Sequence, residues 1–122
     1  MAGSVLVVDD DQGVVEALRQ VLAAHDVNLE SAEDAAGANA LLDSHEFCGM
    51  VLDLVLRTGS GFDVLHHIST KHINIPTVVV TNKLPSYVRE MLDAEHVKLV
   101  FPKPVDPRLL GSIVLGLCGI AV

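Results

Sequence analysis

The sequence predicts an α/β fold in which five parallel strands form one sheet and five helices cover it. Apolar runs alternate along the chain with segments of helical periodicity. The runs are continuously apolar, as is typical of parallel strands that are buried on both faces. Half of the 122 residues are apolar but only 3% are aromatic, which predicts a core of Val, Leu, Ile and Ala. We therefore expect a single domain over residues 1–122.

Three strands and two helices are expected in the first half of the chain. Apolar residues between the first two strands recur at spacings of three and four, which indicates the buried face of a helix. The second helix is rich in Ala and Leu, although Gly37 weakens it by about 1 kcal/mol. In chain order, we expect a strand at Val5–Val8, a helix with Val14, Val15, Leu18, Val21 and Leu22 inward, a strand at Val27–Ser31, a helix at Ala35–Asp43 and a strand at Phe47–Leu52.

Prolines help to delimit the elements of the second half. Pro76 has no N–H to donate and fits the entry of a strand, whereas Pro85 and Pro107 fit the first turns of helices. In chain order, we expect a turn at Arg57–Gly61, a helix at Phe62–Lys71, a strand at Thr77–Thr81, a helix at Ser86–Ala94, a strand at Leu99–Phe101 and a last helix with Leu109, Leu110, Ile113, Val114 and Leu117 inward.

The composition argues against several classes of function. A net charge of −8 is unfavourable for a nucleic-acid-binding surface. The apolar tail Ile113–Val122 is too short to span a bilayer, which needs about 20 residues, and no signal peptide is visible. Cys48 and Cys118 lack CxxC spacing, so we expect two buried free thiols in a reducing, cytoplasmic environment.

Ionisable or hydroxyl side chains stand at the carboxyl ends of four predicted strands. In a parallel sheet these ends meet at one edge, where such sheets bind ligands. Carboxylates brought close together repel one another unless a cation lies between them, and Mg²⁺ both prefers oxygen ligands and bridges to phosphate. The pattern predicts a divalent cation site suited to phosphoryl chemistry, built from Asp9, Asp10, Asp11, Asp53, Thr81 and Lys103.

Each of these residues also has a plainer interpretation. A run of Asp before a helix can supply an N-cap, which needs one carboxylate and suits Asp11 best. Asp53 has apolar neighbours on both sides, where a carboxylate is costly unless it is paired or coordinated. A nucleophile that accepts a phosphoryl group explains that placement, and a loop cap is the alternative. Thr81 could be strand filler and Lys103 a surface charge, although prolines on both sides stiffen the lysine backbone.

Four motifs together resemble the receiver domain of two-component response regulators. They are Val7-Val8-Asp9-Asp10, Leu52-Asp53-Leu54 followed by Gly61, Val80-Thr81, and Lys103-Pro104, and the match covers essentially the whole chain in the right order. The resemblance implies a flavodoxin-like (βα)5 three-layer sandwich with strand order 2-1-3-4-5. It also implies a cytoplasmic, bacterial-type signalling domain that is a phosphoacceptor and not an enzyme.

The resemblance further implies the roles of the acidic residues. Asp53 would accept a phosphoryl group from the phosphohistidine of a histidine kinase or a histidine phosphotransfer protein. Asp10, Asp53 and the backbone carbonyl of Val55 would hold Mg²⁺, with Mn²⁺ as a substitute. Asp9 would contribute to this site directly or through water.

The remaining implied roles concern the phosphorylated state. Thr81 would bond a phosphoryl oxygen after transfer, and Lys103 would pair with Asp53 or with its phosphate. Val55 and Lys83 flank the path of a hydrolytic water and would tune the lifetime of the phosphate.

The chain departs from the family at the switch position, three residues before the lysine, where an aromatic residue is usual and Val100 stands. Phe101 is one place off and should face the other side of the sheet. We expect phosphorylation to survive this change. The family implies that an output domain, a target protein or, on phosphorylation, a second copy docks on the face of the fourth helix, fifth strand and fifth helix.

Two other functions remain open. The receiver fold could serve as a protein-interaction module with little phosphorylation control, which the missing aromatic favours. A haloacid dehalogenase-type phosphatase would use Asp9 as the nucleophile and Asp11 as the acid/base. Against it, Gly13 stands where Thr or Val is usual, a cap domain has no room, and Asp53 is left unexplained.

Overall fold

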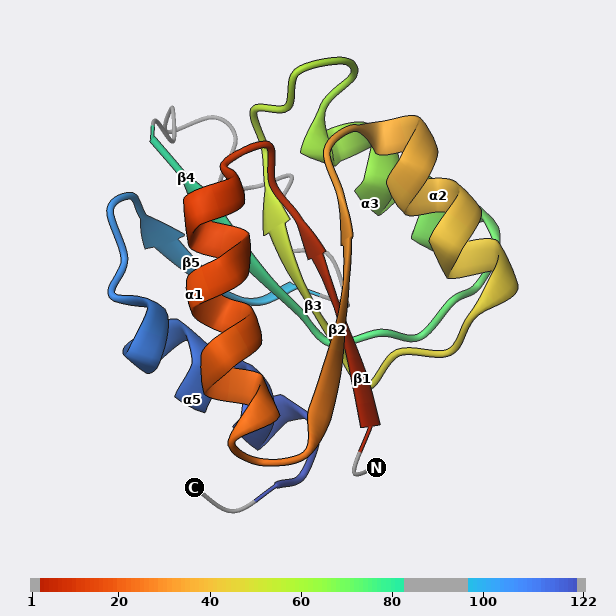
Figure 1. The fold of residues 1–122 in the computed structure, drawn as a ribbon. Helices are drawn as coiled ribbons and strands as arrows, with labels where there is room; N and C mark the ends of the chain where they lie inside the picture. Colours follow the sequence, from red (N-terminus) through yellow and green to blue (C-terminus); the bar gives the residue numbers. More distant parts are fainter. Residues whose placement is uncertain (1–2, 83–96, 121–122) are drawn as a thin grey trace.

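The computed structural model describes residues 3–82 and 97–120, which form a three-layer α/β sandwich (Figure 1). All strand pairs in the sheet are parallel, and the strands lie in the order β2-β1-β3-β4-β5. The predicted fold class and strand order are therefore confirmed. The strands are β1 (Gly3–Val8), β2 (Val27–Ala32), β3 (Gly49–Asp53), β4 (Thr77–Thr81) and β5 (Val97–Pro102).

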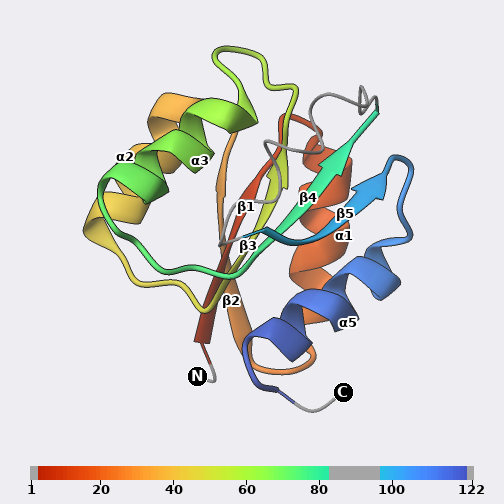
Figure 2. The same ribbon diagram turned by 180° about the vertical axis from the view of Figure 1, so that it is seen from behind.

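Helices cover both faces of the sheet. On one face lie α1 (Gln12–Ala23) and α5 (Pro107–Leu117), and on the other lie α2 (Ala35–Ser44) and α3 (Gly61–Thr70), as Figures 1 and 2 show from opposite sides. The helix predicted at Ser86–Ala94 lies outside the described residues. Within the described ranges, no helix combines the length and hydropathy that crossing a bilayer would require.

Most elements begin where their local sequence favours a start. Each described helix is preceded by an N-cap residue whose side chain accepts a backbone N–H, namely Asp11, Asp34, Ser60 and Asp106. Asp11 accepts from Gly13 at 2.9 Å and Val14 at 3.3 Å, so its capping interpretation is confirmed. The third strand begins at Gly49, where pairing with β1 starts, and not at Phe47 as its apolar character suggested.

The sheet separates two apolar clusters. One packs between the sheet and α2 and α3, and the other between the sheet and α1 and α5. Neighbouring residues of β5 contribute to different clusters, because alternate side chains of a strand point to opposite faces. Val100 packs against the α2–α3 cluster and Phe101 against the α1–α5 cluster, as expected from the sequence.

Two glycines allow close contact between elements. A Cβ at Gly61, the first residue of α3, would lie 2.6 Å from the carbonyl oxygen of Asp53, and the Gly61 N–H donates to Leu54 O at 3.0 Å. A Cβ at Gly111 in α5 would lie 2.5 Å from Cγ1 of Val21 in α1. Because neither glycine has a side chain, α3 can pack against the end of β3 and α5 can pack against α1.

The expectation of two free thiols is wrong. Cys48 and Cys118 are joined in a disulfide, with their Cα atoms 4.9 Å apart. Cys48 immediately precedes β3 and Cys118 is the C-cap of α5. The two residues are 70 positions apart, and spacing along the chain does not reveal that the end of α5 packs beside the start of β3.

Candidate functional site

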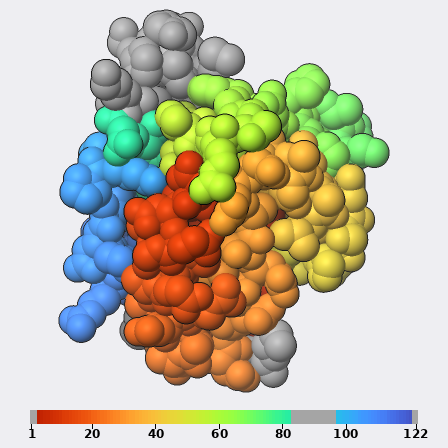
Figure 3. Space-filling model, turned by 45° about the horizontal axis from the view of Figure 1, so that its top comes forward, coloured from red at the N-terminus to blue at the C-terminus, as the bar shows by residue number. Residues whose placement is uncertain are grey.

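The strand register brings the predicted site residues to one edge of the sheet. Val8 of β1 pairs with Leu52 of β3, so the next residues, Asp9 and Asp53, emerge side by side. Asp53 pairs with Val80, which precedes Thr81, and Thr81 pairs with Pro102, which precedes Lys103. Figure 3 shows the β1–α1 segment in red, the β3–α3 segment in yellow-green and the end of β4 in teal meeting on this face.

Lys103 bridges two buried carboxylates from neighbouring strands. Its Nζ donates to Asp9 Oδ2 at 3.0 Å and to Asp53 Oδ2 at 2.8 Å. The side chains of Asp9 and Asp53 are only 0% and 6% exposed, and that of Lys103 is 19% exposed. The backbone N–H of Lys103 donates to Thr81 O at 2.9 Å, and the following peptide bond to Pro104 is cis. The lysine is therefore held from both its backbone and its ammonium group.

Backbone N–H groups hold the second oxygen of each buried carboxylate. Asp9 Oδ1 accepts from the N–H of Asp11 at 2.9 Å, and Asp53 Oδ1 accepts from the N–H of Val55 at 3.0 Å. Each carboxylate thus has one oxygen on a main-chain donor and the other on Lys103. These bonds fix the orientation of both carboxylate planes before any ligand binds.

Burial and charge shift two pKa values in this cluster. Burial raises the pKa of the Asp9 carboxyl above its ordinary value, although the Asp11 N–H and Lys103 partly oppose this. Burial alone would lower the pKa of Lys103, but its hydrogen bonds to Asp53 and Asp9 and their charges outweigh burial and raise it. At neutral pH the ammonium of Lys103 is charged. Ionisation of the buried Asp9 carboxyl costs free energy, and a further cation bound beside it would reduce that cost.

Three of the carboxylates are close enough to share a cation. Asp9, Asp10 and Asp53 each offer an oxygen atom, and these atoms lie within 4.8 Å of one another. With Lys103 counted, three ionised carboxylates leave this cluster with a formal charge of −2. Hard oxygen donors and this charge fit Mg²⁺. Asp11, occupied as the N-cap of α1, is outside the group of three.

The cluster opens into a pocket of about 490 Å³. Thr81 is buried beside it and is not among the described lining residues, whereas the neighbouring Asn82 is. Val55, next to the site, is 63% exposed. Lys83 lies outside the described residues. The residues that line the pocket are Asp10, Asp11, Val14, Asp53, Val55, Val80, Asn82, Lys103, Pro104, Val105 and Leu110.

Sequence reasoning missed the apolar wall of this pocket and a set of polar contacts between the loops that follow β1, β2 and β3. Leu110 was expected only as a core residue, and its part in the wall depends on how α5 packs. At the neighbouring loops, Glu33 accepts from Gln12 Nε2 at 2.8 Å and lies 3.7 Å from Arg57 Nη1. All three residues follow predicted strands, which is the signal that would have pointed to them.

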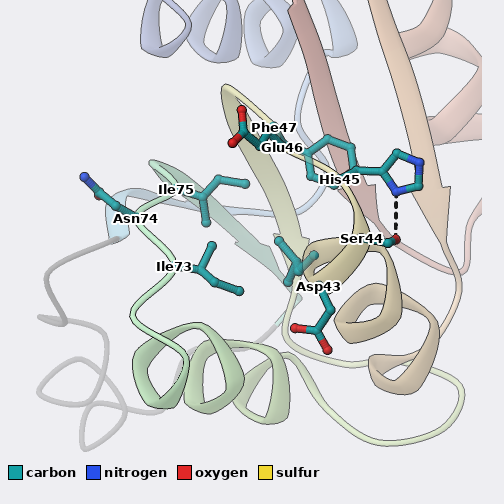
Figure 4. Close-up of a pocket in the computed structure, with 9 residues that line it drawn as sticks. Asp43, Ser44, His45, Glu46, Phe47, Ile73, Asn74 and Ile75 are labelled. Carbon is teal, nitrogen blue, oxygen red and sulfur yellow. Dashed lines mark hydrogen bonds between the residues drawn. The ribbon is translucent and has the colours of Figure 1, made fainter.

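A second hollow lies at the opposite end of the sheet, before the starts of β3 and β4 (Figure 4). Its volume is about 530 Å³, and residues 42–47 and 73–75 line it. Ser44 Oγ and His45 Nδ1 lie 2.8 Å apart there. None of the residues that the motifs singled out borders this hollow, so the acidic edge is the better candidate site.

Comparison with known proteins points to one family. A family model described as the response regulator receiver domain matches residues 5–115. Response regulator MprA of Mycobacterium bovis is 31% identical over 81 residues, which are 66% of this chain and 35% of that protein. The chain thus spans about a third of the length of the curated relatives it matches.

Solved structures share the fold over nearly the whole chain. The non-phosphorylated receiver domain of HemR from Leptospira biflexa has a TM-score of 0.83 and 27% identity, covering 98% of this chain and 96% of that one. A CheY-like receiver domain protein from Methanospirillum hungatei has a TM-score of 0.82 and 23% identity, covering 93% and 92%.

Proposed function

Because this chain belongs to the response regulator receiver family of two-component signalling, we propose that Asp53 accepts a phosphoryl group and that this modification switches a partner. The observation that carries the proposal is the cluster of Asp9, Asp10 and Asp53, in which Lys103 bonds to Asp9 and Asp53. Receiver domains are signalling domains and not enzymes in the usual sense, so Asp53 is itself the site of modification.

The donor in this proposal is the phosphohistidine of a histidine kinase or a histidine phosphotransfer protein. An oxygen of Asp53 attacks phosphorus, the new O–P bond gives an acyl phosphate, and the P–N bond breaks. The electron pair of that bond returns to the imidazole nitrogen. The bonds from Val55 N–H and Lys103 hold the Asp53 carboxylate in place, so the chain contributes mainly positioning and neutralisation of charge.

Mg²⁺ would be held by Asp10, Asp53 and the Val55 carbonyl, with Asp9 bound directly or through water, and Mn²⁺ could replace it. The fit rests on the three carboxylate oxygens within 4.8 Å and on their uncompensated charge. When bound, the ion supplies positive charge to the transferred phosphoryl group. The ammonium of Lys103, which is bonded to Asp9 and Asp53, would supply a second positive charge near the phosphoryl group.

Two residues are assigned to the phosphorylated state. Thr81 follows the residue that pairs with Asp53, so its hydroxyl is proposed to bond a phosphoryl oxygen after transfer. Val55 is exposed next to Asp53 and is proposed, with Lys83, to set how fast water reaches the phosphate.

The proposed output surface includes β5 and α5, for binding of an output domain, a target protein or a second phosphorylated copy. Exposed Leu99 of β5 and Leu109 of α5 would contribute apolar area to it. Phosphotransfer from a histidine kinase would place the chain in the cytoplasm.

The direct test is phosphoryl uptake by Asp53→Asn. With a small phosphodonor such as acetyl phosphate and Mg²⁺, the wild type should gain one phosphoryl group by intact mass, and the variant should gain none. The matched control is Asp11→Asn, because Asn retains N-cap function and the substitution removes a neighbouring carboxylate. Retained uptake in Asp53→Asn, or label mapped to Asp9, would contradict the proposal and favour the dehalogenase-type phosphatase.

The placement of Val100 favours a second candidate, an interaction module with little phosphorylation control. Val100 packs toward the α2–α3 cluster, while the ring of Phe101 packs on the opposite face. Beryllofluoride with Mg²⁺ distinguishes the two functions by amide NMR shifts. Shifts that reach β5 and α5 support the switch, whereas shifts that stay at Asp53 support the interaction module.

A further inference from the structure

The disulfide ties two distant segments at the end of β3 opposite to Asp53. Cys48 is the residue before β3, and Cys118 ends α5. A Cα–Cα distance of 4.9 Å lies within the range that a disulfide spans without backbone movement. The bond therefore joins the C-terminal turn of α5 to the amino end of the strand that carries the proposed phosphoacceptor.

Two glycines leave space for the sulfur atoms. A Cβ at Gly3 would lie 3.1 Å from Cys48 Sγ, and one at Gly49 would lie 3.5 Å from Cys118 Sγ and 3.1 Å from Val114 Cγ2. A side chain at Gly49 would hinder the approach of α5 to β3, and one at Gly3 would crowd the sulfur atom of Cys48. The absence of side chains at these two glycines therefore leaves room for both sulfur atoms of the disulfide.

The same fold also offers a hydrogen-bond acceptor to the thiol of Cys48. Cys48 N–H donates to Ser4 O at 2.9 Å, and Cys48 Sγ lies 3.4 Å from that oxygen, which is an acceptor for the thiol of the reduced form. The end of α5 has its own cap, in which Gly119 adopts a φ of 76° and Ile120 N–H donates to Leu115 O at 3.0 Å. Reduction therefore removes the covalent link but leaves the hydrogen bond between Cys48 and Ser4 and the hydrogen bonds that cap α5.

We propose that Cys48 and Cys118 form a reversible redox clasp, which fixes the C-terminal turn of α5 to β3 when oxidised and releases it when reduced. Both cysteines are half-buried and so are accessible to exchange with a small disulfide. The redox clasp is a second modification of the chain, separate from the proposed phosphorylation of Asp53. Its reversibility rests on the proposed function, because phosphotransfer from a kinase places the chain in the cytoplasm, where disulfides are typically transient and redox-sensing.

The chemistry is thiol–disulfide exchange with a small-molecule disulfide such as oxidised glutathione. One cysteine, as the thiolate, attacks the glutathione disulfide and releases one glutathione thiol. The second cysteine then attacks the mixed disulfide and releases the other glutathione thiol. The two cysteines are oxidised, one glutathione disulfide is reduced to two thiols, and the two cysteine protons end on those thiols.

The first experiment titrates the wild-type chain in glutathione buffers that run from fully oxidised to fully reduced. Alkylation of free thiols followed by intact mass gives the fraction with the disulfide. We expect the monomer to pass in one transition between the form with two thiols and the form with one disulfide. The curve should be the same whether the titration starts from the oxidised or from the reduced protein. A chain that keeps the disulfide in excess reduced glutathione, forms none in the oxidised buffer, or links only between copies would overturn the clasp.

The second experiment locates the effect by hydrogen exchange. Backbone amides of residues 115–120 should exchange roughly tenfold faster or more in the reduced wild type than in the oxidised one, because local opening no longer strains a covalent link. Cys48→Ser and Cys118→Ser should show the faster exchange in every buffer. Equal exchange in both redox states would overturn the mechanical role. Neither readout requires a phosphodonor, so failure of the clasp and failure of phosphorylation at Asp53 are separable.

Discussion

Replacing Lys103 with Met should expose how much the acidic site depends on a cation. At an effective dielectric constant of about 20, two carboxylate oxygens at the 4.8 Å upper limit repel by about 3.5 kcal/mol, so the three pairs of the cluster repel by about 10 kcal/mol or more. The ammonium, at 3.0 and 2.8 Å from two of the oxygens, supplies about 11 kcal/mol of attraction on the same scale. Lys103 therefore offsets much of this repulsion, and its removal leaves the repulsion unopposed.

The measured loss will be smaller than the gross terms, because water and protons enter the vacated site. Breaking a buried ion pair by removing one partner typically costs about 3–5 kcal/mol, and we expect about 3 kcal/mol for Lys103→Met in urea unfolding with EDTA. Mg²⁺ should restore part of this, because it binds the folded cluster and not the unfolded chain. Acidification should restore part of it too, because protonation removes the repulsion.

The matched control is Lys71→Met, which removes an exposed cation at the end of α3 and should change stability by less than about 0.5 kcal/mol. If Lys103→Met loses less than about 1 kcal/mol, or loses the same amount with and without Mg²⁺, the charge argument for this site is refuted.

Two further predictions concern burial and packing. Because burial raises the pKa of Asp9 above 3.8, the folded chain holds this proton to higher pH than the unfolded chain does. In EDTA, the free energy of unfolding of the wild type should therefore fall relative to that of Asp9→Asn as pH rises above 3.8. If urea unfolding shows that the difference between the two free energies does not change with pH, this prediction is wrong. Gly111→Ala should cost about 1–3 kcal/mol because its Cβ would meet Val21 at 2.5 Å. Its control, Gly116→Ala, meets nothing within 4 Å and should gain up to about 1 kcal/mol in thermal unfolding.

The part of the site that the sequence could predict depends on local order and strand polarity. Three of the apolar runs lead directly into Asp or Thr, and a fourth ends shortly before Lys103. If the strands are parallel, their carboxyl ends meet, and these side chains lie at one edge of the sheet. The bond from Lys103 to Asp53 is one that the resemblance to receiver domains implies. The second bond of Lys103, to Asp9, was not expected, because it depends on the depth to which Asp9 is buried.

Other features depend on packing that local patterns do not encode. Phe47 is apolar and was expected in the third strand, but it has no place in the β1–β3 register, which begins at Gly49. The pairing of Cys48 with Cys118 depends on the approach of α5 to β3. The separation of Asp11 from Asp9 and Asp10 also depends on local geometry, because the Asp11 carboxylate accepts the N–H groups of Gly13 and Val14 as the N-cap of α1.

The contact between Gly61 and the end of β3 has a mechanical consequence. The first turn of α3 rests directly on the main chain of Asp53 and Leu54, because Gly61 has no side chain to hold the two segments apart. A shift of the main chain at Asp53 would therefore press directly on the first turn of α3, on the face of the sheet where Val100 also packs.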